Sequence, residues 1–406
     1  MPVLPLVLFS LTYLGFALGE VPGLKLDRTG VALLGAVAFL STGGISVQEA
    51  KAAVDGPTLA VLFGMMLLSA QYRMSGLYAA IGNRLTQARS ARRLLLGTIL
   101  AAALLSAVLT NDVVCFALTP LLAGSLLRSG RDPLPYLLAL AAASNLGSAL
   151  TPIGNPQNIH IAQTLGLAFL PFVLACAVPV VLSLALLYLL LIRWVGRDGG
   201  TSLRPTGAGA TSEEEIPLNR WQARKAVLLT LAAIALFLSP VPAPLTALGV
   251  AGVVLTSRRM HSRDMLGLVD WQLLALFVGL FVVVRGFELS GWTEAARRAL
   301  AGAGADLSRP AVLVPGVAVL SNLVSNVPAV ILLLRLIDHR AATGYLLALA
   351  STFAGNAFLV GSIANLIVAE QAARLGVPFR FRDHLRLGLP LTVVSLVFAL
   401  LASRWW

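Results

Sequence analysis

The sequence predicts an all-α polytopic membrane protein that consists of two inverted-topology repeats. Of its 406 residues, 58% are hydrophobic and only 12% are charged, which is more apolar surface than a soluble core can hide. Apolar stretches of about 20 residues, the length of a membrane-spanning helix, recur along the chain. Two segments, 55–122 and 270–337, also read as copies of each other in one register. A duplicated apolar unit with a polar centre is typical of secondary transporters.

Ten apolar segments are expected to span the bilayer as helices, beginning near residues 3, 29, 57, 135, 166, 223, 243, 270, 343 and 387. The first, Val3 to Gly19, lacks the basic n-region and the cleavage site of a signal peptide, so we expect a retained helix. Two further apolar segments, 93–127 and 310–335, are each interrupted by a polar turn. Each is either one kinked crossing or a re-entrant hairpin.

The distribution of basic residues decides between these alternatives. If both segments are hairpins, the loops on one face contain 21 of the 30 lysines and arginines, and the loops on the other face contain 7. If 93–127 were a crossing, the arginines of 84–93 and of 128–131 would lie on opposite faces. The hairpin alternative predicts an inner-membrane protein with both termini outside the cytoplasm. Its halves are inverted, and one hairpin enters from each face.

These boundaries divide the chain into two repeats, 1–193 and 223–406, joined by a cytoplasmic linker at 194–222 that is rich in Gly, Thr, Ser and Glu. In the first repeat we expect scaffold helices in 1–76, the hairpin at 93–127 and a broken helix at 135–163. In the second repeat the corresponding ranges are 223–289, 310–335 and 343–371.

The two broken helices follow the hairpins. The run TPIGNPQN at 151–158 contains two prolines, each of which removes a backbone donor and clashes with the preceding turn, so the helix must unwind there. In the second half the run GSIAN at 361–365 matches it, with Gly154 opposite Gly361 and Asn158 opposite Asn365. Unwound backbone at membrane depth survives only where protein or a water-filled cavity satisfies its polar groups.

The hairpin tips and the breaks therefore supply the candidate site. Helix N-termini suit an anion or a neutral oxyacid, whereas carbonyl and amide oxygens suit sodium. The alternative is that the asparagines only cap the half-helices. The candidate substrate-binding residues are Thr110, Asn111, Asn155, Asn158, Ser325, Asn326, Ser362 and Asn365. The candidate ion-coupling residues are Asp112, Asn111, Gly154, Asn326 and Gly361, with sodium at Asn111, Asn158, Asn326 and Asn365.

One carboxylate departs from the symmetry, since Asp112 stands where the second copy has Val327. A charged side chain this deep is costly, so we expect Asp112 to exchange a proton or to be held ionised by a bound cation or a helix dipole. The alternative is an N-cap of a half-helix that begins at Val113.

Several function classes are excluded. The net charge of +12 lies in short loops, which predicts topology signals and no nucleic-acid partner. Motifs for ATP binding and for hydrolytic catalysis are missing, so we expect neither an ATP-driven pump nor an enzyme. Cys115 and Cys176 have no metal-ligand spacing. We expect no cofactor other than a coupling proton or sodium ion.

The tip residues Thr110–Asp112 and Ser325–Pro328, together with the runs at 151–158 and 361–366, resemble the ion transporter superfamily. That group contains divalent anion symporters, citrate permeases, arsenite permeases and NhaD-type sodium/proton antiporters. The resemblance covers nearly the whole chain. It implies a homodimer in which hairpins and broken helices move as an elevator against a scaffold. In the dicarboxylate symporters a Ser-Asn-Thr motif at each tip contacts the substrate, and only Asn111, Asn326 and Ser325 carry over here.

The predicted function is secondary active transport of a small anion or oxyacid, with a carboxylate and arsenite both open as substrates. A proton or sodium gradient is the expected driving force. The alternatives are a sodium/proton antiporter of the NhaD type and a channel that uses the same breaks.

Overall fold

The computed structural model describes residues 2–19, 23–88, 90–197 and 217–406. Its regular elements are helices, and the described ranges contain no strand. Most of the predicted linker at 194–222 lies outside the described residues. The first-half helices are α1 (Val3–Leu18), α2 (Arg28–Ser41), α3 (Val47–Ala53), α4 (Gly56–Met74), α5 (Leu77–Thr86), α6 (Ala91–Val108), α7 (Asn111–Arg128), α8 (Leu134–Ser148), α9 (Pro156–Leu165) and α10 (Phe169–Arg197). The second-half helices are α11 (Arg220–Phe237), α12 (Ala243–Leu255), α13 (Ser262–Gly267), α14 (Trp271–Leu289), α15 (Trp292–Gly302), α16 (Pro310–Val324), α17 (Asn326–Leu333), α18 (Ala341–Ala354), η1 (Leu359–Gly361), α19 (Ile363–Arg374), α20 (Phe381–Ala402) and η2 (Ser403–Trp405).

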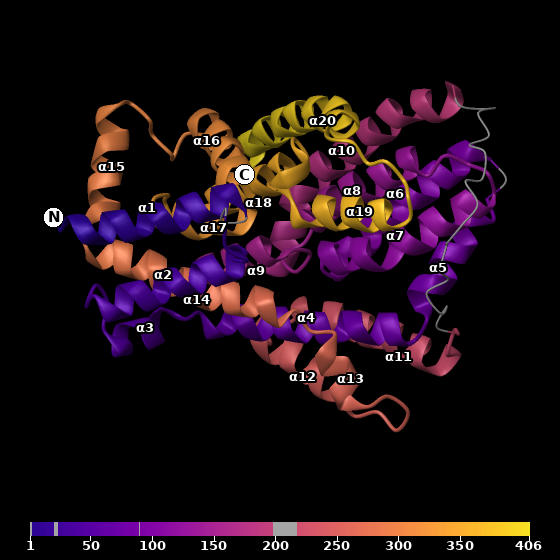
Figure 1. Cartoon of the computed structure of the whole chain (residues 1–406), viewed down its shortest axis with the longest axis horizontal. Helices are drawn as coiled ribbons and strands as arrows, with labels where there is room; N and C mark the ends of the chain where they lie inside the picture. Colours follow the sequence, from indigo (N-terminus) through magenta and orange to yellow (C-terminus); the bar gives the residue numbers. More distant parts are fainter. Residues whose placement is uncertain (1, 20–22, 89, 198–216) are drawn as a thin grey trace.

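The helices form two packed groups (Figure 1). In the first group α4 packs against α12 and α11, and α14 packs against α2 beside α1. The second group contains α6 to α10 and α16 to α20, with α6 against α8, α16 against α18 and α7 against α19. The groups meet where α4 contacts α9 and α14 contacts α17.

Matched positions of the two sequence copies adopt the same local structure. Asp55 caps α4 by accepting from the amide three residues later at 3.1 Å, and Asp270 caps α14 in the same way at 2.9 Å. A Cβ on Gly64 would overlap the carbonyl of a residue in α12, and a Cβ on Gly279 would lie 2.8 Å from a carbonyl in α2. Glycine is required at both crossings because it allows the two backbones to approach closely.

Helices α6 and α7 form a hairpin. Only two residues separate them, and Arg131, just beyond α7, donates from Nη1 to the carbonyl of Ala88, just before α6, at 3.2 Å. Both ends of the pair therefore lie at one end of the molecule, near α5 (Figure 1). Beyond the end of α17, the carbonyl of Arg335 accepts from Arg297 in α15 at 2.8 Å. Helices α15 and α16 lie at the opposite end of the molecule from α5 (Figure 1).

The protein is a multi-pass membrane protein by the composition of these helices and by the apolar side chains that they expose, such as Leu104, Leu174 and Val181. Within the described residues, four helices are long and apolar enough to cross a membrane, and the bent pair α3 and α4 would make a fifth. Five more apolar helices have between 10 and 17 residues. At 1.5 Å per residue these fall short of a core about 30 Å thick, so the count of ten crossings stays a prediction.

Candidate functional site

A cluster of buried amides lies where the first hairpin tip meets the second break, and Asn145 of α8 is at its centre. The Oδ1 atom of Asn145 accepts from Asn111 Nδ2 at 2.9 Å and from Ser362 Oγ at 3.0 Å. Its Nδ2 atom donates to Asn356 Oδ1 at 2.9 Å and to Asn365 Oδ1 at 3.1 Å. All five side chains are buried. One amide therefore connects elements from both halves of the chain.

The two breaks interlock reciprocally. Ser362, in the second break, donates to Asn145 in the helix before the first break. Asn155, in the first break, donates from Nδ2 to Thr352 Oγ1 in the helix before the second break at 3.2 Å. Residues 155 and 362 are 207 positions apart, and so are residues 145 and 352. The same contact is thus made twice between equivalent positions.

Each break is also closed by one asparagine in the same way. Asn158 donates from Nδ2 to the carbonyls ten and seven residues before it, at 3.3 and 3.1 Å. Asn365 donates from Nδ2 to the carbonyls ten and seven residues before it, at 2.8 and 3.4 Å. These bonds replace the backbone partners that the interrupted helix lacks, so the break holds one defined shape.

The first hairpin tip is fixed onto the first break. The amide nitrogen of Asn111 donates to the carbonyl of Gly154 at 3.3 Å, and the Thr151 hydroxyl donates to the carbonyl of Ala107. A Cβ on Gly154 would overlap the carbonyl oxygen of Ser148 and would lie 2.8 Å from that of Ser106. Any other residue at 154 would push the tip away from the break.

The second hairpin tip has a strained backbone. Ser325, between α16 and α17, has φ 76° and ψ 159° and is the one described non-glycine residue with positive φ. Such conformations cost about 1–3 kcal/mol and are concentrated at functional sites. The next residue, Asn326, is buried, and its Nδ2 atom would lie 2.9 Å from a Cβ placed on Gly355. On Gly361 a Cβ would lie 2.6 Å from Asn322 Oδ1.

Several buried side-chain oxygens at the tips and breaks have no hydrogen-bond partner among the described residues. Buried oxygens without a hydrogen-bond partner include Asn111 Oδ1, Asn158 Oδ1, Asn322 Oδ1 and Asn326 Oδ1, with the hydroxyls of Ser106 and Ser321. In this region Asn356 Nδ2 is the one buried side-chain nitrogen of the described residues without a partner. Of the four predicted sodium ligands, only Asn365 uses its side-chain oxygen within the protein. Leaving a buried acceptor unpaired costs roughly 1–3 kcal/mol, so a hydrogen-bond donor or a cation at these oxygens would be stabilising.

Helix N-termini supply the complementary donors. Helices α7, α17 and α19 begin at the tips and at the second break, and none of them has a side-chain cap. Helix α9 differs, because Asn155 Oδ1 accepts from the amide of Asn158 at 2.9 Å. Asn155 therefore caps a half-helix with its side chain, as the capping alternative proposed. The side chains of Asn111 and Asn326 cap no helix.

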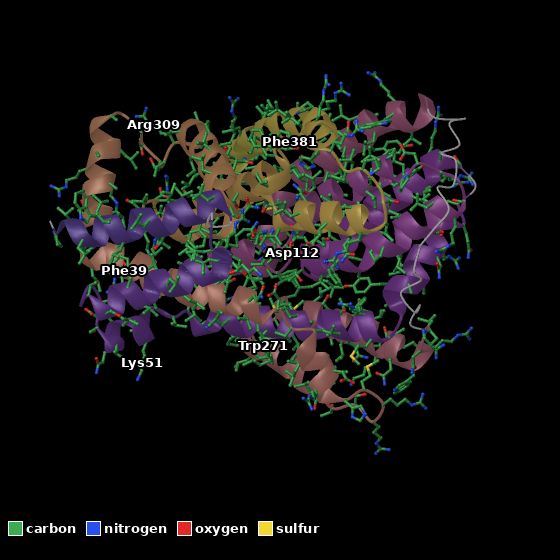
Figure 2. The ribbon with its side chains drawn as sticks, in the orientation of Figure 1. Phe39, Lys51, Asp112, Trp271, Arg309 and Phe381 are labelled. Atoms are coloured by element: carbon green, nitrogen blue, oxygen red, sulfur yellow. The ribbon has the colours of Figure 1, made fainter. Side chains whose placement is uncertain are left out.

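Asp112 lies in the first turn of α7, at the middle of the molecule (Figure 2). The helix begins at Asn111 with Thr110 as its N-cap residue, so Asp112 is not the N-cap that the alternative proposed. Its half-buried side chain makes no hydrogen bond or ion pair with the described residues, and its charge repels that of Asp270 at the start of α14. Val327, its counterpart, is buried.

A histidine links the two helix groups. His160 Nδ1 of α9 lies 3.1 Å from Asp55 Oδ2 at the start of α4 and 3.3 Å from Thr58 Oγ1. The ring also packs against Phe277 and Phe281 of α14. This contact crosses the boundary between the groups at the N-terminal end of α4.

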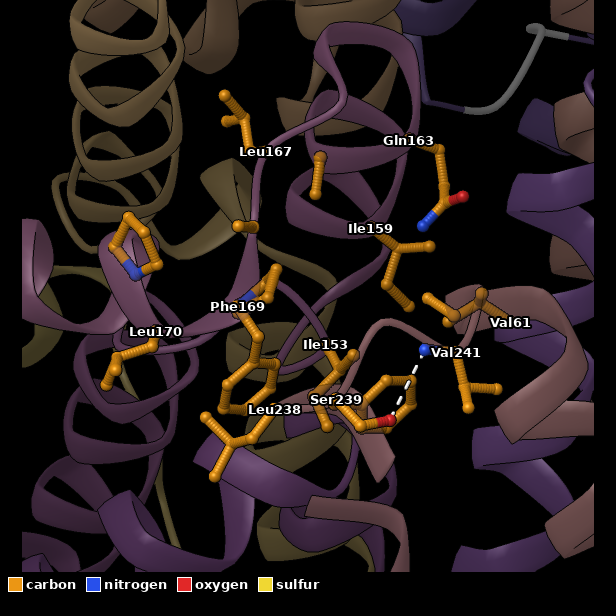
Figure 3. A pocket seen from close by; sticks show the side chains of 16 residues that line it. Val61, Ile153, Ile159, Gln163, Leu167, Phe169, Leu170, Leu238, Ser239 and Val241 are labelled. Atoms are coloured by element: carbon orange, nitrogen blue, oxygen red, sulfur yellow. Dashed lines mark hydrogen bonds between the residues drawn. The ribbon is translucent and has the colours of Figure 1, made fainter. Parts of the chain in front are cut away.

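A separate apolar cavity of about 270 Å³ borders the first break (Figure 3). Pro152 and Ile153 form one wall, and Phe237 and Leu238 at the end of α11 form another. Ser239 Oγ is already engaged with the amide of Val241 at 3.3 Å. The lining does not suit a charged ligand. The amide cluster remains the candidate site.

The structure brings most of the predicted site residues together. Asn111, Ser362 and Asn365 meet at Asn145, while Asn155 and Asn158 bond within the first break and to α18. Thr110 is buried beside Asn111, and Ser325 and Asn326 form the second tip. The prediction omitted Asn145, Asn322, Thr352 and Asn356. Asn145 and Asn356 had a signal, since Asn145 lies in the run SNLGS before the first break and Asn356 follows a glycine before the second. Asn322 and Thr352 each follow a single serine in an otherwise apolar stretch.

Comparisons with known proteins agree on one family. A family model described as "Citrate transporter" (CitMHS) matches residues 13–354. The silicon efflux transporter LSI3 of Oryza sativa is 31% identical, over 96% of this chain and 94% of that protein. The 46 kDa membrane protein of Mycobacterium leprae is 28% identical over 98% and 97%, and the putative transporter arsB of Dictyostelium discoideum is 25% identical over 92% and 86%.

The crystal structure of the Alcanivorax borkumensis YdaH transporter, whose title reports an unusual topology, resembles this fold. The two chains superpose with a TM-score of 0.57 over 98% of this chain and 96% of that one, at 16% sequence identity. At that identity the likeness concerns the fold alone.

Proposed function

The chain belongs to the citrate transporter (CitMHS) family, and from this premise we propose that it is a secondary active transporter of a small oxyacid. The amide cluster and the two hairpin tips form its substrate site. The observation that carries the proposal is the set of unpaired side-chain oxygens on Asn111, Asn158 and Asn326. Asn111 and Asn326 are the first residues of α7 and α17, whose N-termini have no side-chain cap. Such a site both accepts and donates hydrogen bonds.

A small, hydroxyl-rich acid matches this combination. Arsenous and silicic acids are uncharged at neutral pH, so their hydroxyl groups donate to amide oxygens and their oxygens accept from helix N-termini. Entry of a neutral molecule also avoids the desolvation cost of an ion. The relatives named for silicon efflux and as arsB agree with this choice.

A carboxylate ligand would need a cation beside it. Its oxygens only accept, so the unpaired asparagine oxygens would remain unsatisfied unless a cation bound beside it. Sodium prefers such carbonyl and amide oxygens, and we propose Asn111, Asn158 and Asn326 as its ligands in that case. Carboxylate binding would therefore require sodium, whereas oxyacid binding would not.

Asp112 is our candidate for coupling to the proton or sodium gradient. It has no partner among the described side chains, and it lies on the hairpin that also carries Asn111. Asp270, at the start of α14 in the other helix group, acts on Asp112 by charge repulsion. An unpaired carboxylate on a hairpin can bind either a proton or a cation, and this favours sodium/proton exchange as the second candidate function.

We further propose an elevator mechanism in a homodimer. The interlocked breaks and both hairpins would move as one body, and α1, α2, α4, α11, α12 and α14 would form the scaffold. Few polar contacts join the two groups: they include His160 with Asp55, the Tyr13 hydroxyl with the carbonyl of Pro328 at 3.0 Å, and Arg335 beyond α17 with Glu288 of α14 at 3.6 Å. The loop charges support an inner-membrane orientation with both termini outside and with inverted halves.

Thermal-shift measurements on the purified protein test the substrate class. A ligand that binds only the native state raises the melting temperature by mass action. We expect arsenous or silicic acid to raise it equally in sodium and potassium buffers. Stabilisation by citrate in sodium buffer alone would instead identify the carboxylate symporter.

A further inference from the structure

The side-chain amide of Asn145 has no capacity left for a ligand. An asparagine amide offers two donor hydrogens and two acceptor lone pairs. Asn145 receives bonds from Asn111 and Ser362 and gives bonds to Asn356 and Asn365. A substrate contact would break one of these four bonds. The role of Asn145 must therefore be exerted through its neighbours.

The bonds around Asn145 determine which atom of each neighbouring amide points where. The orientation of Asn365 is set by the backbone carbonyls of Gly355 and Phe358. A carbonyl oxygen can only accept, so the atom of Asn365 that bonds to them must be Nδ2. Its Oδ1 atom must then accept, and the group that donates to it is Nδ2 of Asn145.

The same logic continues to the first hairpin tip. With its nitrogen committed to Asn365, Asn145 presents Oδ1 to Asn111, so Asn111 must donate from Nδ2. The side-chain oxygen of Asn111 is then the free atom, and it is one of the buried oxygens without a partner. The orientation of Asn111 is thus set by backbone carbonyls of the second break, which belong to the other half of the chain.

We propose that Asn145 is a positioning residue that holds Asn111 with its oxygen toward the ligand and thereby makes the first hairpin tip an acceptor site. Without Asn145, the Asn111 amide would be free to rotate and to present its nitrogen, which cannot accept a hydrogen bond from a ligand hydroxyl. The inference rests on the proposed function, since it takes Asn111 to be a ligand residue. Through Asn365 and Asn145, the backbone of the second break would then determine which ligands the first hairpin tip binds.

A double-mutant cycle tests the proposal through the binding of arsenous acid. In Asn111→Ser the hydroxyl oxygen both donates and accepts and can rotate, so the orientation of the side chain no longer matters. We expect Asn145→Ala to weaken arsenous acid binding by roughly 10- to 100-fold, the usual effect of losing a group that orients a ligand residue. In the Asn111→Ser background the same substitution should change arsenous acid binding less than about twofold. Binding is read as the arsenous acid concentration at half-maximal thermal shift.

Thr392→Val is the matched control, because it removes a buried hydrogen bond to the Phe353 carbonyl without touching the amide chain. It should leave the arsenous acid response unchanged. Equal losses from Asn145→Ala in both backgrounds would overturn the positioning role and leave the proposed function intact. If the wild-type protein does not respond to arsenous acid, Asn111 is no ligand residue for it and both proposals fail. Should Asn145→Ala not fold, Asn145→Ser completes the same cycle with the same criteria.

Discussion

Asn155 and Ser362 occupy equivalent positions, 207 residues apart, in the two breaks, and each donates a hydrogen bond to the helix that precedes the other break. Asn155 reaches Thr352 at 3.2 Å and Ser362 reaches Asn145 at 3.0 Å, so each break is tied to the helix that precedes the other break. The breaks cannot separate without losing buried hydrogen bonds, each of which contributes about 1 kcal/mol. Relative motion is therefore cheaper at the boundary between the two helix groups than between the breaks.

Removal of the tip asparagines should abolish transport. In Asn111→Ala and Asn326→Ala the ligand loses an amide oxygen at each tip, while the remaining bonds of both breaks are kept. We expect wild-type elution in size-exclusion chromatography and no flux in proteoliposomes. Ser308→Ala, an exposed hydroxyl outside the site, serves as a control that should transport normally. Wild-type flux from either asparagine variant would defeat the site assignment.

Asp112→Asn should change the pH dependence of transport. The amide keeps the shape of the side chain but neither gains nor loses a proton in the working range. We expect initial rates measured from pH 5 to 9 to lose their dependence on pH in this variant. Asp264→Asn, at an exposed position in α13, should reproduce the wild-type profile. An unchanged profile in Asp112→Asn would reduce Asp112 to a favourable charge at a helix N-terminus.

A loop carboxylate gives a pH prediction for stability. Partial burial raises the pKa of Asp338, but hydrogen bonds from Thr343 and Arg340 and the charge of Arg340 outweigh it, so the pKa lies below its usual value. Because the folded-state pKa is lowered, this stabilisation is present above the unfolded pKa of about 3.9 and is lost as pH falls through the folded value. We expect Asp338→Asn to lower the melting temperature more at pH 7 than at a pH below about 3.9. An equal deficit at both values would contradict this assignment.

Gly154→Ala should separate the first hairpin tip from the first break. The added methyl group would overlap backbone carbonyl oxygens of Ser148 and crowd that of Ser106, which cannot move aside as a side chain can. We expect a loss of stability of about 1–3 kcal/mol together with loss of flux. Gly316→Ala in α16 meets nothing within 4 Å and is the matched control. Normal transport by Gly154→Ala would show that the close contact is not needed.

The sequence predicts the membrane class, the positions of the polar tips and breaks, and the family, because each depends on local composition or on motifs such as TPIGNPQN. Asn145 illustrates what it does not predict. The polar run around it marks a break in the apolar pattern but not its bonding partners, and two of these, Asn111 and Asn365, lie 34 and 220 residues away. Composition also does not determine where each helix ends, since α12 has 13 residues within an apolar stretch that is predicted to be a crossing.

Flux of arsenous acid and silicic acid in proteoliposomes with an imposed proton or sodium gradient is the most direct test of the central claim. The account predicts accumulation against the substrate gradient that collapses when an ionophore dissipates the driving gradient and that is absent in Asn111→Ala. Downhill flux that ignores the ionophore, or transport of citrate with no oxyacid flux, would contradict it.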